Sequence, residues 1–349
     1  MADRAPRSSW VWTRAIVAPA ARRALPVWIG TGIVAGVIFG PTGMRPRDLT
    51  NLALGAPLVG LVVVATWLLL FVPTARVIVR AEAARYLRSL PSARWPVVAI
   101  AVTALIGLQL PWLALWLLGA GPLGAVIVGL VTILASGVAW WRFAPPKTGA
   151  LRWRGPIAAL FGIYARALRR RAVDALLRAA GLAVLAGIAA GLFGRNNELA
   201  PREAGVLATA AIAVVLTPGW AGTLLPPIET HRDSAWLAAS TGISEQARTA
   251  ALAAIVVAIY LATGAVAGIA ATIVEPSAWT IPLVLACALG QALVATRAMI
   301  RAERSQAMTA RVVVGAIVAS AIAVVALGAL GATGALAMLA IGVLAVGTA

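Results

Sequence analysis

Two short segments combine acidic and basic side chains at a spacing that suits recognition of a partner. Glu82 and Arg85 lie three residues apart, and Arg88 follows at the same interval. Glu229 and Arg232 repeat the Glu-x-x-Arg spacing in the second half of the chain. Residues three apart share a face of a helix, where the planar arginine fork can bind a carboxylate in two places. These five residues are therefore candidates for docking a partner.

The first of these segments also has the pattern of a short surface helix. Apolar side chains at helical spacing form one stripe, which consists of Val79, Ala83, Tyr86 and Leu90. Pro91 predicts the end of this helix, because proline disfavours the helical conformation of the residue before it. The alternative is an ordinary basic loop beside a membrane, which needs no partner.

The motifs of common catalytic sites are absent from the sequence. It contains no GxxxxGK[ST] loop for nucleotide phosphates, no HExxH zinc motif and no GxSxG nucleophile motif. His231 is the only histidine and Cys287 the only cysteine, which excludes most metal and triad chemistry within the chain. We therefore expect no enzymatic activity, no metal and no cofactor.

A few polar or aromatic side chains occur deep within apolar runs. They are Gln109, Trp112, Trp220 and Gln291. Such residues could line a substrate path, or they could hydrogen-bond neighbouring helices. The predicted hydrocarbon cores contain no charged residue, which argues against proton- or ion-coupled transport.

The composition is that of an integral membrane protein, since 62% of the residues are hydrophobic and only 11% are charged. A spanning helix needs about 20 apolar residues. Charge-free runs at 24–44, 49–75, 95–141, 204–228, 249–274, 276–296 and 312–349 supply most of the crossings. The runs at 95–141 and 312–349 are long enough to fold back, with turns expected at Gly119–Pro122 and Gly331–Gly334. With a further crossing at 179–194, the sequence predicts an all-α bundle of about ten transmembrane helices.

The basic residues predict the orientation of this bundle. If the N-terminus is cytoplasmic, the inner segments hold 25 of the 29 lysines and arginines. Cytoplasmic loops are enriched in these residues, so we expect both termini inside, in a multi-pass protein of the plasma (inner) membrane. The net charge of +18 then marks an inner face that meets anionic lipids or an acidic partner. Because the charge is dispersed over loops, we do not expect nucleic-acid binding.

The order of the elements suggests two unequal repeats. GIVAGVIFG at 32–40 and GIAAGLFG at 187–194 each follow a basic run and precede a short outer loop. A crossing and then a Glu-x-x-Arg segment come next in both halves. We predict repeats at 1–154, with four crossings, and 155–349, with six. Shared Ala and Gly bias is the alternative explanation.

In the order of its elements and in the first Glu-x-x-Arg segment, the chain resembles the permease subunits of ABC-2-type exporters. The residues that carry the resemblance are Glu82, Arg85, Leu87, Ser89, Leu90, Pro91, Ser92 and Arg94. In that family this segment is a coupling helix that docks on the ATP-binding subunit, and a basic elbow precedes the first crossing. The resemblance implies elbows at 10–23 and 163–178, whereas ten crossings depart from the six that are common in the family.

The resulting hypothesis is a permease subunit of an ATP-driven exporter for a hydrophobic or amphipathic substrate. Its coupling segments would be 76–95 and 227–248. Its partners would be a cytoplasmic ATP-binding subunit and membrane lipids, and a second permease chain is a further candidate partner. The alternatives are a non-catalytic membrane scaffold or assembly protein that docks another cytoplasmic partner, and a transporter that ATP does not drive.

Overall fold

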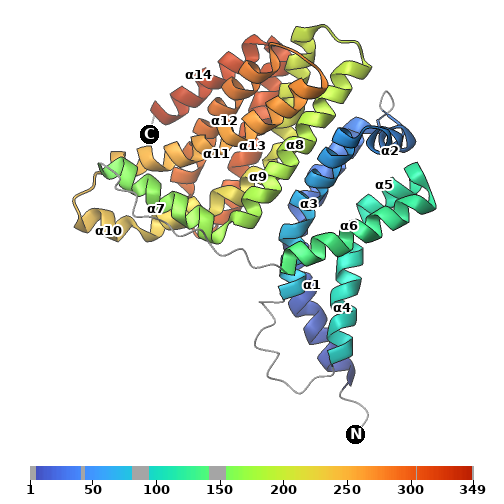
Figure 1. Cartoon of the computed structure of the whole chain (residues 1–349). Helices are drawn as coiled ribbons and strands as arrows, with labels where there is room; N and C mark the ends of the chain where they lie inside the picture. The colour runs from blue at the N-terminus through green and yellow to red at the C-terminus, as the bar shows by residue number, and fades with distance from the viewer. Residues whose placement is uncertain (1–4, 41–43, 81–93, 141–154, 304, 348–349) are drawn as a thin grey trace. The chain divides into compact units, whose positions relative to one another are not determined.

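The structure is a computed structural model of the chain. It describes residues 5–40, 44–80, 94–140, 155–303 and 305–347. Within these ranges every regular element is an α-helix, which confirms the all-α prediction (Figure 1). The predicted docking residues Glu82, Arg85 and Arg88 lie outside the described residues.

The chain divides into two compact units. Unit 1 consists of Met1–Ile29 and Met44–Pro146, and unit 2 of Gly30–Gly43 and Lys147–Ala349. The proposed repeat relationship between the two halves stays a prediction.

Unit 1 contains the first part of α1 and five further helices. Their bounds are α1 (Ala5–Ile38), α2 (Pro46–Gly55), α3 (Pro57–Arg80), α4 (Arg94–Leu108), α5 (Leu110–Ala120) and α6 (Pro122–Trp140). Helix α1 has no interruption, so the expected elbow at 10–23 and the crossing after it form one helix. The run 49–75 is divided at Ala56, whose backbone is extended because Pro57 follows it.

Two further irregularities shape unit 1. Helices α4 and α5 meet at Gln109 with a bend of 55°, and Pro111 lies in the first turn of α5. Proline removes one helical hydrogen bond and clashes with the carbonyl four residues earlier, which explains the bend. The fold-back expected at Gly119–Pro122 is confirmed, since α5 ends at Ala120 and Gly121 has a φ of 59°.

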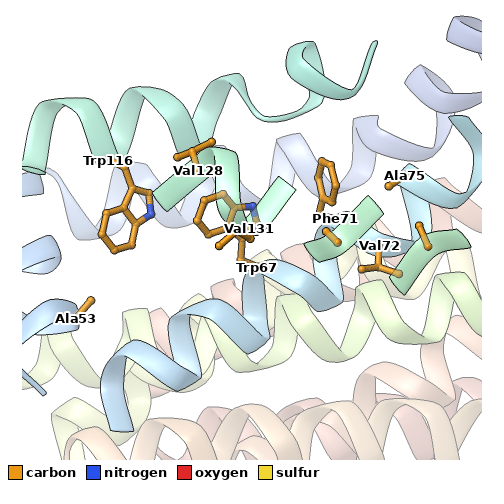
Figure 2. Close-up of a cluster of buried hydrophobic side chains, with 10 residues drawn as sticks. Ala53, Trp67, Phe71, Val72, Ala75, Trp116, Val128 and Val131 are labelled. Carbon is orange, nitrogen blue, oxygen red and sulfur yellow. The ribbon is translucent and has the colours of Figure 1, made fainter. Parts of the chain in front are cut away.

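The core of unit 1 is rich in aromatic side chains. Trp67 of α3, Trp116 of α5 and Val131 of α6 are buried in one cluster, which Figure 2 shows together with Phe71 and Val128. The ring of Trp67 stacks on that of Trp112 with 4.8 Å between the ring centroids. Large rings therefore join α3 to the bent α4–α5 segment and to α6.

Unit 2 is the larger helical bundle. Besides the end of α1, its helices are α7 (Pro156–Arg171), α8 (Val173–Asn196), α9 (Pro201–Asp233), α10 (Ala235–Ser240), α11 (Glu245–Val274), α12 (Thr280–Ala302), α13 (Met308–Leu330) and α14 (Thr333–Gly347). The elbow expected at 163–178 differs from the structure, where α7 ends at Arg171 and α8 begins after a break at Ala172. The predicted turn at Gly331–Gly334 is confirmed, and Gly331 has a φ of 59°.

Glycines allow close helix contacts in unit 2. A Cβ atom on Gly290 of α12 would lie 2.5 Å from the carbonyl oxygen of Met338 in α14. A Cβ on Gly342 would lie 2.7 Å from the carbonyl oxygen of Gly290. Small residues at such contacts are typical of helices that pack within a bilayer, where there is no hydrophobic drive between them.

The helices of the described ranges have the lengths and composition of membrane spans. Seven are long and apolar enough to cross, and the bent α4–α5 pair makes eight if it counts as one span. The seven are α3, α6, α8, α9, α11, α12 and α13. The chain is thus a multi-pass membrane protein, while the number ten and the cytoplasmic location of both termini stay predictions.

Candidate functional site where helices α9, α11 and α12 begin or end

Unit 2 contains a cluster of ionisable side chains where several helices begin or end. We call it the charged cluster, and it consists of Tyr164, His231, Glu245, Arg248 and Glu303. These residues come from α7, the last turn of α9, the first turns of α11 and the residue that caps α12. Their position outside the apolar centres of the helices explains how a membrane protein can keep them.

Arg248 lies at the centre of the charged cluster. Its Nη1 donates to Glu245 Oε2 at 2.5 Å, and its Nη2 donates to Glu303 Oε1 at 3.2 Å. The same Nη2 donates to the backbone carbonyl oxygen of His231 at 2.9 Å. Only 7% of the Arg248 side chain is exposed, compared with 15% for Glu303 and 66% for Glu245. A buried guanidinium is stable only when it is paired, so Glu303 is the more important of the two acidic partners.

His231 joins the cluster to α7. Its ring is fully buried, and its Nδ1 lies 2.8 Å from the hydroxyl oxygen of Tyr164. Its Nε2 lies 3.6 Å from Glu303 Oε2. Burial raises the pKa of the Tyr164 phenol above its ordinary value, so the hydroxyl stays protonated at neutral pH and can donate to the imidazole.

Three residues of the cluster have the chemistry of metal ligands. Ligand atoms of His231, Glu245 and Glu303 lie within 4.8 Å of one another. However, the guanidinium of Arg248 contacts both carboxylates. A metal ion would have to displace this arginine, so the arrangement fits a network of ion pairs better than a metal centre.

The charged cluster lies at the base of the segment 232–247, which connects α9 to α11 and which we call the excursion. Between His231 and Arg248 the chain leaves α9, forms the six-residue helix α10 and enters α11. The Oγ of Ser244 caps α11 by accepting a hydrogen bond from the backbone nitrogen of Ala247 at 3.2 Å. Trp236, on α10, has 71% of its surface exposed. The excursion therefore presents a large apolar side chain on a base that is fixed by the buried arginine.

The predicted docking residues of the second half lie at the edge of this excursion. Glu229 is partly buried in the penultimate turn of α9, and Arg232 is exposed one turn later. The Nε of Arg232 lies 3.8 Å from Oδ1 of its neighbour Asp233, where both side chains are in water and the pair contributes little stability. Arg232 is therefore accessible to a partner.

Gln109 and Trp112, the predicted path residues of unit 1, both contact Trp67 of α3. The indole nitrogen of Trp67 donates to Gln109 Oε1 at 2.9 Å, and the Trp67 ring stacks on Trp112. Gln109 is buried, and among the described residues its Nε2 has no hydrogen-bond partner. Both predicted residues thus belong to the helix contacts around the bend between α4 and α5.

The other two path residues lie in unit 2 and make separate contacts. Trp220 stacks on Tyr260 with 4.1 Å between ring centroids, and its Nε1 donates to Thr263 Oγ1 at 2.8 Å. Gln291 Nε2 donates to Ser320 Oγ at 3.2 Å. Each side chain bonds a neighbouring helix, which is the packing role that the sequence left open beside a substrate path. The role in a path stays a prediction.

Sequence reasoning missed the charged cluster as a unit. It set His231 aside because a lone histidine supports neither a triad nor a common metal motif. One available signal was the Glu245-x-x-Arg248 pair at the start of an apolar run, which has the same spacing as Glu229 and Arg232. The contribution of Tyr164 and Glu303 depends on how distant helices pack, which the spacing does not reveal.

Comparison with protein families and known proteins gives no further guide to function, since no family model, curated protein or solved structure matches the chain.

Proposed function

We propose that the chain is the transmembrane subunit of an exporter that is driven by ATP hydrolysis on a separate cytoplasmic subunit. Its substrate would be hydrophobic or amphipathic, because the chain offers mainly apolar surfaces. In this proposal both termini are cytoplasmic and the protein resides in the plasma membrane, as the 25 basic residues of the inner segments favour.

The observation that carries the proposal is the construction of the excursion at 232–247. An element that transmits force needs an exposed contact for its partner and a rigid base in the membrane. Trp236 supplies an exposed apolar contact, and Arg248 ties the base to the carbonyl oxygen of His231 and to Glu303. Through these bonds, displacement of α10 would move α9, α11 and α12. It would also move α7, which is bonded to His231 through Tyr164.

The segment at 76–95 would provide a second contact with the ATP-binding subunit. This part of the proposal rests on the resemblance of Glu82, Arg85 and the residues after them to the coupling helix of ABC-2 permeases. ATP binding on the partner would move both segments and, with them, the helices of each unit. The chain itself would hydrolyse no nucleotide, since its sequence has no phosphate-binding loop.

Site-specific photo-crosslinking tests the proposal. A photoreactive amino acid replaces Trp236 in the full chain, which is expressed in its native membrane and irradiated. We expect a crosslinked product that contains an ATP-binding subunit. The control position is Ile273, which is also apolar and exposed but lies near the other end of α11 and should give no such product.

The outcome also separates the proposal from its alternatives. Crosslinking of Trp236 to a protein without a nucleotide-binding site would favour a scaffold or assembly role and contradict the ATP-driven exporter. Crosslinking to lipid alone would contradict docking through α10 altogether.

A further inference from the structure

An apolar pocket lies within unit 1. Its volume is about 520 Å³, which lies within the range of small-molecule sites. One wall is the face of α1 from Thr13 to Trp28, and the opposite wall runs from Ala99 of α4 to Leu110 of α5. Ile78 of α3 also lines it. Apart from Thr13 and Thr103, the lining residues are apolar.

Small side chains create the length and depth of this pocket. Ala20, Ala21 and Ala24 line it from α1, and Gly107 lines it from α4. A Cβ atom on Gly107 would meet nothing within 4 Å, so the space beside it is open. At about 1.5 Å per residue, the stretch from Thr13 to Trp28 is roughly 22 Å long. An apolar space of this volume that follows such a length of helix suits a single hydrocarbon chain.

Basic residues are sequence neighbours of the residues that line one end of the same pocket. Arg14 directly follows Thr13 and is exposed, and its guanidinium lies 5.4 Å from the centre of the Trp10 ring. Arg76 and Arg80 each lie two residues from Ile78 on α3. Ile78 and Trp12 belong to one hydrophobic cluster, which places the basic end of α3 close to the start of α1. Basic pockets between membrane helices are typical sites for anionic lipid headgroups.

We propose that this pocket binds one acyl chain of an anionic membrane phospholipid, with the lipid phosphate beside Arg14. The apolar walls hold the chain, and the guanidinium selects the charged headgroup because it forms charge-assisted bonds with phosphate oxygens. This inference concerns unit 1 alone and does not depend on the proposed ATP-driven export.

Spin-labelled lipids test the proposal directly. The full chain is reconstituted in phosphatidylcholine vesicles that contain a small share of phosphatidylglycerol labelled near the end of one acyl chain. We expect a motionally restricted component in the spectrum that is stronger than the one from labelled phosphatidylcholine. Arg14→Gln should lower this preference about fivefold, as expected for the loss of one basic residue near a lipid headgroup.

Two glycine variants separate the pocket from general lipid contact. Gly107→Leu should fill the pocket and remove the excess of the restricted component that labelled phosphatidylglycerol shows over labelled phosphatidylcholine. Gly129→Leu is the matched control, because Gly129 lies on α6 and does not line the pocket, and a Cβ atom on it would likewise meet nothing within 4 Å. Ala21→Leu fills the pocket from α1 and serves if Gly107→Leu does not fold.

The proposal is contradicted if the pocket-filling variants and Gly129→Leu keep the same excess of the restricted component for phosphatidylglycerol. Equal restriction of the two labelled lipids would contradict the role of Arg14 and the anionic headgroup. None of these measurements requires an ATP-binding subunit.

Discussion

Arg248 and Glu303 come from different helices and meet at 3.2 Å between Nη2 and Oε1, with both side chains largely removed from water. Glu245 meets the same guanidinium at 2.5 Å but stands mostly in solvent. The two carboxylates therefore contribute differently to stability, although each contacts the same arginine. Loss of a buried partner leaves an uncompensated charge, whereas an exposed pair exchanges its contact for water.

This difference predicts unequal effects of two equivalent substitutions. Glu303→Gln should lower the free energy of unfolding by about 3 kcal/mol, because Arg248 then lacks its buried counter-charge. Glu245→Gln should lower it by less than about 1 kcal/mol. Thermal unfolding of the detergent-solubilised full chain measures both. Equal losses in the two variants would show that burial does not distinguish these ion pairs.

The hydroxyl of Tyr164 provides a second test of the charged cluster. Tyr164→Phe should cost about 1 to 3 kcal/mol, since it leaves the buried Nδ1 of His231 without its partner. Tyr260→Phe is the control, because the buried hydroxyl of Tyr260 has no hydrogen-bond partner among the described residues. Its removal should be nearly neutral or slightly stabilising. The same unfolding assay compares the two, and a larger loss for Tyr260→Phe would contradict the assignment.

Helix packing in unit 2 predicts the effect of adding a single methyl group. Gly290→Ala should destabilise the chain by about 1 to 3 kcal/mol, because the new Cβ would press on the backbone of α14 at Met338. Gly328→Ala, on α13, should be neutral or stabilising by up to about 1 kcal/mol, since its Cβ would meet nothing within 4 Å and alanine favours the helix. If Gly290→Ala unfolds like wild type, α12 and α14 do not approach as closely as described.

The helical fold was predictable from local patterns, and its interruptions were predictable only in part. The turns at Gly121 and Gly331 were expected because glycine can adopt positive φ and each run was too long for one crossing. The break at Ala56 was missed, although Pro57 was its signal, because continuous apolar composition favoured a single crossing at 49–75. The elbow at 10–23 was expected as a separate element, yet helix α1 continues through it.

The candidate site was less predictable than the fold, for a physical reason. Helical spacing relates residues three or four apart, such as Glu245 and Arg248, but contains no information on which distant helix supplies the next partner. Tyr164 and His231 are 67 positions apart, and Arg248 and Glu303 are 55 apart. Their proximity follows from packing of α7, α9, α11 and α12. Glu229 and Arg232, chosen by spacing, lie beside the charged cluster but outside it.

The orientation can be tested by cysteine labelling of intact cells. We expect Asn196 and Ala278 to be labelled from outside and Ser240 and Ser305 only after the membrane is opened. Ser277 is not a suitable labelling position because it is buried. Its Oγ donates to the carbonyl oxygen of Pro201 at 2.9 Å, which places the turns before α9 and α12 at the same end of unit 2. The native Cys287 is buried and should give little background. Labelling of Asn196 only from the cytoplasmic side would show that unit 2 has the opposite orientation in the membrane.

Trp236 is the exposed tryptophan of α10. Trp236→Ala should leave the free energy of unfolding within about 0.5 kcal/mol of wild type, because the side chain is 71% exposed and packs little. If α10 docks on the ATP-binding subunit, the same change should weaken that complex about 30-fold, since exposed aromatic anchors are typical hot spots of interfaces. Trp140→Ala is the matched control, with 69% exposure on α6, and should leave the affinity unchanged. Affinity is measured by titrating the purified ATP-binding subunit onto the full chain in nanodiscs. The affinity could be unchanged in Trp236→Ala while the photoreactive variant at position 236 still crosslinks to the partner. This result would mean that α10 lies near the partner without contributing to its binding.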